Sequence, residues 1–178
     1  MNYNIKNERK NNKMKVQEYI LENQDSFKLK DIFECGQCFR WNKQEDESYT
    51  GVIKNAVINV KQADNKIIFK GISENNLSEV VKEYFDLDMD YQNLKSKLSK
   101  IDEFMKESIE FGEGIRILNQ DLWECIISFI ISANNNIPRI KKIIEAISKK
   151  YGKKVLFENK EYYFCPTVEE LSKATVEE

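Results

Sequence analysis

The residues best suited to chemistry in this sequence form an asparagine-rich turn with an arginine beside it. Asn134, Asn135 and Asn136 follow one another, and Arg139 comes one helical turn later. An asparagine amide offers both donors and acceptors, and a helix that begins after the turn adds free backbone N–H groups. Such a set can read the edge of a nucleic-acid base or hold a phosphate. Asparagines also favour turns and helix caps for their own sake, so composition alone leaves that alternative open.

Two helices must present this turn. Asp121 is a good N-cap, and Glu124 three residues later completes a capping-box pattern. The residues that follow, up to Ser132, are apolar on nearly every side of a helix, which predicts a position in the middle of a core. Asn136 can cap a second helix with Pro138 in its first turn, and isoleucines follow at helical spacing. The sequence therefore predicts a buried helix that delivers the asparagines to an exposed turn.

Cys35 and Cys38 enclose Gly36 in a C-x-x-C motif. A closed zinc site needs four ligands, but Cys125 and Cys165 stand alone and the chain has no histidine. A thioredoxin-like dithiol should open a helix, whereas this motif leads into a predicted strand. We therefore predict no metal site, and a redox dithiol remains a rival interpretation. Gly36 itself suggests a separate role, because a glycine lets the backbone come close to a ligand.

The net charge of the chain and its distribution indicate which classes of partner are favoured. The chain has 178 residues, 41% of them hydrophobic, a net charge of −2 and a pI of about 5.5. This balance gives no global support to nucleic-acid binding, which usually goes with a basic chain. The distribution is uneven, however, because residues 136–154 carry seven Lys or Arg against Glu145 alone, a surplus of +6. A basic helix face is often only solvated surface, but this one borders the asparagine turn.

A sheet is predicted before the helices. Dense Val, Ile and Phe indicate strands at residues 38–41, 49–54, 56–61 and 66–72. Lys54-Asn55 and Asp64-Asn65 are suitable hairpin turns. The short connections imply an antiparallel meander.

The period then becomes helical. Ser73 is predicted to cap a helix at residues 77–85, and Asp90 to cap a second. A third helix, over residues 102–111, should stop at Gly112. A short helix is expected at residues 167–173, whereas residues 16–27 begin structure of uncertain type.

The order of the elements predicts an α+β fold, in which an antiparallel sheet domain with helices precedes the start of an all-helical domain. The expected divisions are a disordered tail at residues 1–13, the sheet domain at 14–112 and the first helices of the second domain at 113–178. The tail is polar and lacks the apolar run of a signal peptide, which predicts an intracellular chain with reduced thiols.

Two segments resemble a known family. Residues 36–41, Gly-Gln-Cys-Phe-Arg-Trp, are similar to the Gly-Gln-Ser-Phe-Arg-Trp segment of 8-oxoguanine DNA glycosylases of the helix-hairpin-helix superfamily. Residues 120–140 resemble that family's Asn-Asn-Asn-Ile segment and the helix before it. The resemblance runs from about Phe27 to Pro166, and the two motifs together are specific.

The resemblance implies roles for these residues. Gly36 would accept, through its carbonyl, the N7–H that oxidised guanine has and guanine lacks, so that guanine would face it acceptor to acceptor. Asn134 would enter the space left by the flipped base and contact the estranged cytosine, and Arg139 would hydrogen-bond that cytosine. Asn135 and Asn136 are grouped with them as expected contacts to DNA.

The sequence also departs from the family. The family's Leu-Pro-Gly-Val-Gly hairpin, nucleophilic lysine and catalytic aspartate have no counterpart in the 178 residues. Cys38 stands where the family usually has serine, and Leu122 where a proline is common. We therefore expect the N-terminal portion of a bacterial 8-oxoguanine DNA glycosylase/AP lyase, as a fragment or a truncated reading frame, with no catalytic residue and no activity alone.

The expected partner is double-stranded DNA containing oxidised guanine, with no cofactor and no membrane. We further expect a monomer in the bacterial cytoplasm, associated with the nucleoid, and a C-terminal half that completes the site. Two rival interpretations remain open. One is a non-catalytic module that binds damaged DNA with an affinity that falls steeply with salt. The other is the redox dithiol of Cys35 and Cys38.

Overall fold

A five-stranded antiparallel sheet organises the first half of the chain in the computed structural model, which describes residues 14–22 and 26–175. Within these ranges the strand order is β1-β5-β4-β3-β2. The strands are β1 Val16–Glu22, β2 Trp41–Lys43, β3 Tyr49–Ile53, β4 Ala56–Ala63 and β5 Lys66–Ser73. The meander from β2 to β5 and the α+β class are as predicted. The tail predicted at residues 1–13 lies outside the described residues.

Two tight turns fix the register of the meander. Lys54 and Asp64 adopt the left-handed conformation, with φ of 44° and 52°. Their turns pair Ile53 with Ala56 and Ala63 with Lys66, which leaves two residues in each loop. Two-residue hairpins require positive φ because only then does the turn match the twist of the strands. Both predicted turns are confirmed.

One face of the sheet packs against two helices, α1 (Leu29–Glu34) and α2 (Leu77–Tyr84). Phe85 lies fully buried at the centre, with the rings of five aromatic neighbours around it. Trp41 stacks on Phe33 at 4.2 Å between ring centroids and donates to the Tyr84 hydroxyl at 3.0 Å. Aromatic side chains of this size dominate the burial energy of a small core. The loop before β2 therefore leads directly into this aromatic core.

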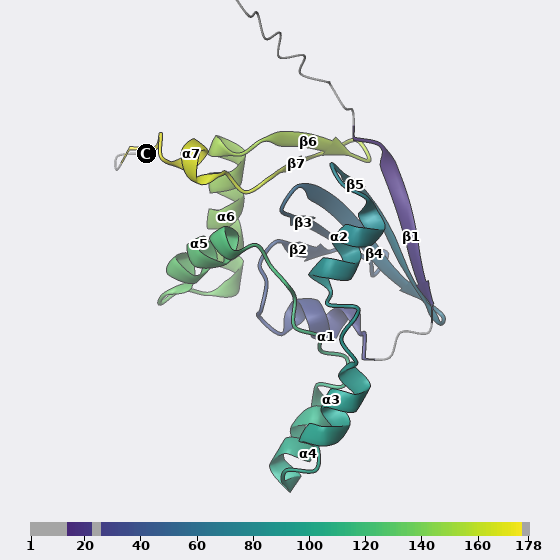
Figure 1. Cartoon of the computed structure of the whole chain (residues 1–178). Coiled ribbons are helices and arrows are strands. Elements are labelled where there is room, and N and C mark those ends of the chain that lie inside the picture. The colour runs from purple at the N-terminus through teal and green to yellow at the C-terminus, as the bar shows by residue number, and fades with distance from the viewer. Residues whose placement is uncertain (1–13, 23–25, 176–178) are drawn as a thin grey trace, which may run out of the picture.

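The opposite face of the sheet is covered by a hairpin from the far end of the chain (Figure 1). This hairpin consists of β6 (Lys154–Phe157) and β7 (Lys160–Tyr163), joined by Glu158 and Asn159, both at positive φ. Its apolar side chains pack on those of β3, β4 and β5 in a second cluster, made of Val52, Val57, Ile72, Val155, Phe157 and Phe164. The sequence analysis did not predict this hairpin, because each strand has only four residues and a single inward face.

Several predicted details need correction. The strand predicted at residues 38–41 begins only at Trp41, because Phe39 and Arg40 form a bend that turns the arginine away from the sheet ladder. Asn76, not Ser73, caps α2, since its side chain accepts from Ser78 N, whereas Ser73 ends β5. The segment of uncertain type, residues 16–27, contains the edge strand β1, whose Tyr19 and Leu21 pack against the core while only partly buried, and the six-residue helix α1 follows it.

Two further helices project from the sheet domain (Figure 1). They are α3 (Tyr91–Leu98), capped by Asp90 as predicted, and α4 (Glu103–Phe111). Asp102, predicted as the first residue of α4, is its N-cap, and Gly112 caps its end as expected. Residues 112–121, which we call the connector, then return along the sheet domain. Lys28 N donates to Gly114 O at 3.1 Å and Asn119 N to Tyr84 O at 2.8 Å, so the connector is tied down at both ends.

The organising helix is α5 (Leu122–Ser132), followed by α6 (Ile137–Tyr151) and the short α7 (Val168–Leu171). Asp121 caps α5 by accepting from Glu124 N, as predicted. The prediction that α5 is buried is wrong, because only Ser128 is buried and Leu122 and Phe129 are 74% and 79% exposed. The described residues give it one main neighbour, α6, and leave most of its apolar surface uncovered. No described helix is long and apolar enough to cross a membrane.

Candidate nucleic-acid interface

The asparagine turn lies between α5 and α6, where the chain reverses direction. Ala133 ends α5, Asn134 takes a left-handed φ of 50°, and Asn136 caps α6 by accepting from Arg139 N at 3.1 Å. Asparagine tolerates the left-handed region better than most residues because its short amide can bond locally. The turn therefore projects its side chains from a rigid helix-turn-helix corner.

The three asparagines do different work in this corner. Asn135 donates to Ile131 O at 3.0 Å and accepts from Asn136 N at 2.9 Å, so its amide closes the turn. Asn136 is engaged as the helix cap. Within the described residues, the Asn134 amide and the Arg139 guanidinium make no hydrogen bond or ion pair. These two side chains are thus available to a ligand, while Asn135 and Asn136 hold the backbone that presents them.

Asn134 and Arg139 face a common open hollow of about 370 Å³, lined also by Ser132, Asn135 and Asn136. The expected contact residues of the turn are therefore brought together. Gly36 does not line this hollow. A hollow with amide and guanidinium groups and almost no apolar wall fits a polar ligand that is itself rich in acceptors.

The basic surface beside the turn is smaller than the sequence count implies. Lys141 donates to Trp41 O at 2.5 Å, Lys153 pairs with Glu74 at 3.0 Å, and Lys154 pairs with Glu161. Lys142 and Lys149 make no ion pair within the part of the chain that the structure describes. Lys153 and Lys154, each paired with a glutamate, contribute little to long-range attraction of an anion. The remaining positive charge of this surface includes Arg139, Lys142 and Lys149, and also Lys141, which bonds only to uncharged oxygens.

Gly36 lies in the loop between α1 and β2. Its φ is +88°, and a Cβ built on it would meet nothing within 4 Å. A side chain would therefore be excluded by backbone conformation and not by lack of space. The peptide beside it is open to a ligand, and no described residue hydrogen-bonds to its carbonyl. These are the features expected of a residue that reads a ligand with its backbone.

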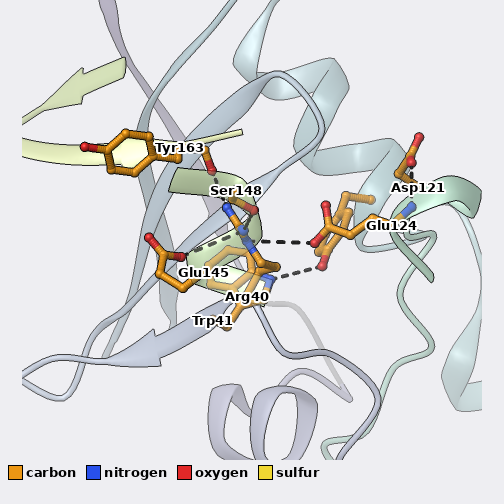
Figure 2. Close-up of polar contacts among 8 residues, drawn as sticks. Arg40, Trp41, Asp121, Glu124, Glu145, Ser148 and Tyr163 are labelled. Atoms are coloured by element: carbon orange, nitrogen blue, oxygen red, sulfur yellow. Dashed lines mark hydrogen bonds and ion pairs between the residues drawn. The ribbon is translucent and has the colours of Figure 1, made fainter. Parts of the chain in front are cut away.

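Arg40 is the buried link between this loop and the helices (Figure 2). Its guanidinium donates to Ser148 Oγ of α6 and to the Tyr163 carbonyl of β7. Its Nε lies 3.9 Å from a Glu124 carboxylate oxygen of α5, and its Nη1 lies 3.8 Å from Glu145. One side chain thus connects the start of β2 with three later elements.

The carboxylate that faces Arg40 is largely, but not fully, removed from solvent. The Glu124 side chain is 16% exposed. Burial raises the pKa of Glu124 to about 7, although the attraction of Arg40 acts in the opposite direction. The reciprocal capping bond expected of Glu124 is replaced by this pairing, so Asp121 alone caps the helix.

The four cysteines are free thiols, and Cys35 alone among them is exposed. Burial raises the pKa of Cys38 and of Cys165 to about 12 and also raises the pKa of Cys125. Cys35 and Cys38 are not joined by a disulfide, and the redox interpretation of this pair stays a prediction. Within the described residues, no three or more Cys, Asp or Glu side chains lie where they could hold a metal ion together.

Gln37 and Arg40 belong to the Gly-Gln-Cys-Phe-Arg-Trp motif, but the motif alone predicts no separate role for either residue. A signal for Arg40 was present, because a cation between two aromatic residues at the edge of an apolar strand must find partners when it is buried. Gln37 carried no comparable signal, since its hydrogen bonds are made to backbone atoms remote in sequence.

The sequence and the fold of this chain match those of known proteins. Residues 19–126, more than half of the chain, match the family described as 8-oxoguanine DNA glycosylase, N-terminal domain. The N-glycosylase/DNA lyase OGG1 of Arabidopsis thaliana is 28% identical over 151 residues, covering 82% of this chain and 41% of that protein. The N-glycosylase/DNA lyase of Saccharomyces cerevisiae is 30% identical over 171 residues, covering 87% of this chain and 45% of its own length.

A solved structure is more similar still. The apo form of the Clostridium acetobutylicum 8-oxoguanine glycosylase/lyase superposes with a TM-score of 0.83 at 46% identity, covering 92% of this chain and 59% of that one. The same protein in complex with double-stranded DNA containing cytosine opposite 8-oxoguanine gives the same TM-score and identity. The chain thus spans less than half the length of the two curated relatives. It belongs to the 8-oxoguanine DNA glycosylase family and carries that family's N-terminal domain.

Proposed function

We propose that these 178 residues supply the lesion-reading and opposite-strand contacts of an 8-oxoguanine DNA N-glycosylase/AP lyase that acts on oxidised guanine opposite cytosine in duplex DNA. The observation that carries the proposal is the hollow at the α5–α6 corner, where Asn134 and Arg139 are free while their neighbours hold the turn. The complex of the similar Clostridium protein with DNA of this kind supports it.

Discrimination of the lesion would lie at Gly36. Oxidised guanine carries a hydrogen on N7, whereas guanine carries a lone pair there. A carbonyl fixed against that atom gains a hydrogen bond with the first base and meets a second acceptor with the other. Because the site is built to hydrogen-bond a donor, it rejects the base that lacks one more strongly than a fit of shape alone could.

Recognition of the other strand would lie at the α5–α6 corner. Extruding a base leaves an unpaired partner and an empty space in the stack, which costs a few kcal/mol. The Asn134 amide is short, polar and held on a rigid turn, which suits insertion into that space. Arg139 offers a fork of donors that matches the acceptors on the pairing edge of cytosine. The exposed Lys142 and Lys149 would add contacts to phosphate.

The chemical step needs a partly deprotonated amine close to the sugar. Burial lowers the pKa of Lys95, but this lysine lies on α3, over the Tyr91 ring, and donates to the Glu113 carbonyl. It is therefore committed to the fold of the α3–α4 projection. We propose that the nucleophile and its partner carboxylate come from outside these 178 residues and that the exposed face of α5 packs against that part of the enzyme.

The test compares duplexes that differ only at one pair. Fluorescence anisotropy of the 178-residue chain should show tighter binding to a duplex with 8-oxoguanine opposite cytosine than to one with adenine opposite the lesion. Arg139→Ala should remove that preference, whereas Lys142→Ala, a matched loss of charge on the same helix, should weaken both complexes equally. Equal affinity of the unaltered chain for the two duplexes would contradict the proposal.

A parallel assay separates the enzyme from its rival, a non-catalytic module that binds damaged DNA. The chain alone should neither nick the lesion strand nor form a borohydride-trapped adduct. Addition of the rest of an 8-oxoguanine glycosylase should restore both activities if the chain is part of such an enzyme. We further propose that the protein acts as a monomer in the bacterial cytoplasm, on nucleoid DNA.

A further inference from the structure

Gln37, the residue after Gly36, has every polar atom of its side chain engaged. Its Nε2 donates to Ile32 O at 3.0 Å and to Arg116 O at 2.8 Å. Its Oε1 accepts from Leu118 N at 3.0 Å. An amide with both donor hydrogens and its acceptor in use cannot rotate without losing several bonds at once. Gln37 is therefore locked between α1 and the connector.

The backbone of the same residue is held as well. Gln120 Nε2 donates to the Gln37 carbonyl at 2.7 Å. Gln37 is thus fixed on both sides of its Cα, by its own side chain and by a side chain from the connector. The peptide unit that joins Gly36 to Gln37 ends on this fixed residue, and that unit contains the Gly36 carbonyl.

Gly36 itself supplies no rigidity. It has positive φ, no side chain and nothing within 4 Å of the position where a Cβ would lie. The Gly36–Gln37 peptide unit rotates through ψ of Gly36 and φ of Gln37, and a glycine leaves its ψ less restricted than a residue with a Cβ would. Rotation by about half a turn would exchange the carbonyl for an N–H at the same place.

That exchange would invert the chemistry of recognition. A carbonyl accepts from the N7–H of oxidised guanine, whereas an N–H donates to the bare N7 of guanine. The orientation of one peptide unit therefore decides which of two bases is favoured, and the anchor of that unit is Gln37.

We propose that Gln37 is a positioning residue that sets the selectivity of the site by holding the Gly36–Gln37 peptide with its carbonyl toward the lesion. The inference rests on the proposed function of Gly36 and extends it to the neighbouring residue. Gln120 is the second support of the same peptide. Neither residue touches the base.

The experiment measures selectivity and not affinity alone. The 178-residue chain and its variants are titrated by anisotropy against two duplexes, one with 8-oxoguanine and one with guanine opposite cytosine, and the ratio of the two dissociation constants is the readout. Gln37→Met keeps the length of the side chain and removes all its hydrogen bonds, and should lower the ratio about tenfold. Gln120→Met removes one bond and should lower it about threefold.

Gln62→Met is the matched control, because Gln62 also donates to a backbone carbonyl, that of Phe27 at 3.3 Å, but lies on β4 away from the loop. It should leave the ratio unchanged. Circular dichroism confirms folding, and Gln120→Met carries the test if Gln37→Met does not fold.

One outcome would contradict the proposed function, and another would contradict only the role of Gln37. If the unaltered chain binds the two duplexes equally, the proposed function fails and the inference falls with it. If the unaltered chain is selective and the Gln37 and Gln120 variants weaken both duplexes by the same factor, Gln37 is only a structural residue and the inference alone is wrong.

Discussion

Helices α2 and α5 differ in a way that their sequences do not reveal. The apolar side chains of α2 form a stripe, and Leu77 and Val81 on that stripe are 1% and 0% exposed. Those of α5 occupy nearly the whole circumference, yet none of them is buried. The cause is the neighbours, since α2 lies against a complete sheet and α5 mainly against α6. The hydrophobicity of a helix thus measures the cover that it requires and not the cover that the rest of the chain provides.

The largest loss of stability is expected from a change at Arg40, which links the sheet domain to α5 and α6. Arg40→Met leaves the Glu124 carboxylate buried without its cation and frees Ser148 and the Tyr163 carbonyl. Breaking one side of a buried pair costs about 3–5 kcal/mol of unfolding free energy when the remaining group stays charged, so the loss should be largest above the Glu124 pKa of about 7. Urea denaturation measures this loss. The double variant Arg40→Met with Glu124→Gln should lose less than the sum of the two single losses, and strict additivity would show that the pair is not coupled.

The next prediction compares the loss of stability caused by a leucine-to-alanine substitution in α2 with that caused by one in α5. Leu77→Ala opens a cavity beneath α2 and should lower the unfolding free energy by about 3 kcal/mol. Leu122→Ala removes a side chain that is 74% exposed at the start of α5 and should change it by less than about 0.5 kcal/mol. Both are measured by urea denaturation. Comparable losses at the two positions would mean that α5 is covered in solution, for example by self-association.

A smaller effect depends on pH. The pKa of Glu124, raised by burial to about 7 from 4.5, means that the folded state holds its proton more tightly than the unfolded state between these values. Stability should therefore rise as the pH falls from 7 toward 4.5, by at most about 1.4 kcal/mol per pH unit from this group. In Glu124→Gln this contribution should vanish, so the difference between the two proteins should shrink at low pH. An identical pH profile for both would contradict the burial of the carboxylate.

The smallest change in stability is expected at the outer face of α5. Phe129 is 79% exposed, so Phe129→Gln should leave the melting temperature within about 2 °C of the unaltered chain. The same variant should bind less of a fluorescent dye that detects apolar surface, because it removes the largest side chain of the patch. Phe85→Leu in the buried aromatic cluster serves as the contrast, since it should lower the melting temperature without reducing dye binding by the native state.

Much of the fold follows from local rules in the sequence. The turns at Lys54 and Asp64, and the caps Asp90, Asp102, Asp121 and Asn136, were predictable because each depends on a few adjacent residues. The β6–β7 hairpin and the role of Gln37 were not, because both depend on contacts between residues far apart in the chain. In the candidate site, too, the turn itself was predictable from adjacent residues, but the partners of each asparagine were not. Free and engaged asparagines look alike in sequence, and only their partners distinguish Asn134 from Asn135.

The β6–β7 hairpin also has a consequence for the order of folding. The second face of the sheet, with Val52 and Val57, is closed by Val155 and Phe157, which leave the ribosome long after β5. Contacts so distant in sequence slow folding, because a large loop must close before they form. Until these residues are synthesised, a nascent sheet has no cover on that apolar face, and exposed apolar surface of this kind makes folding intermediates prone to aggregate.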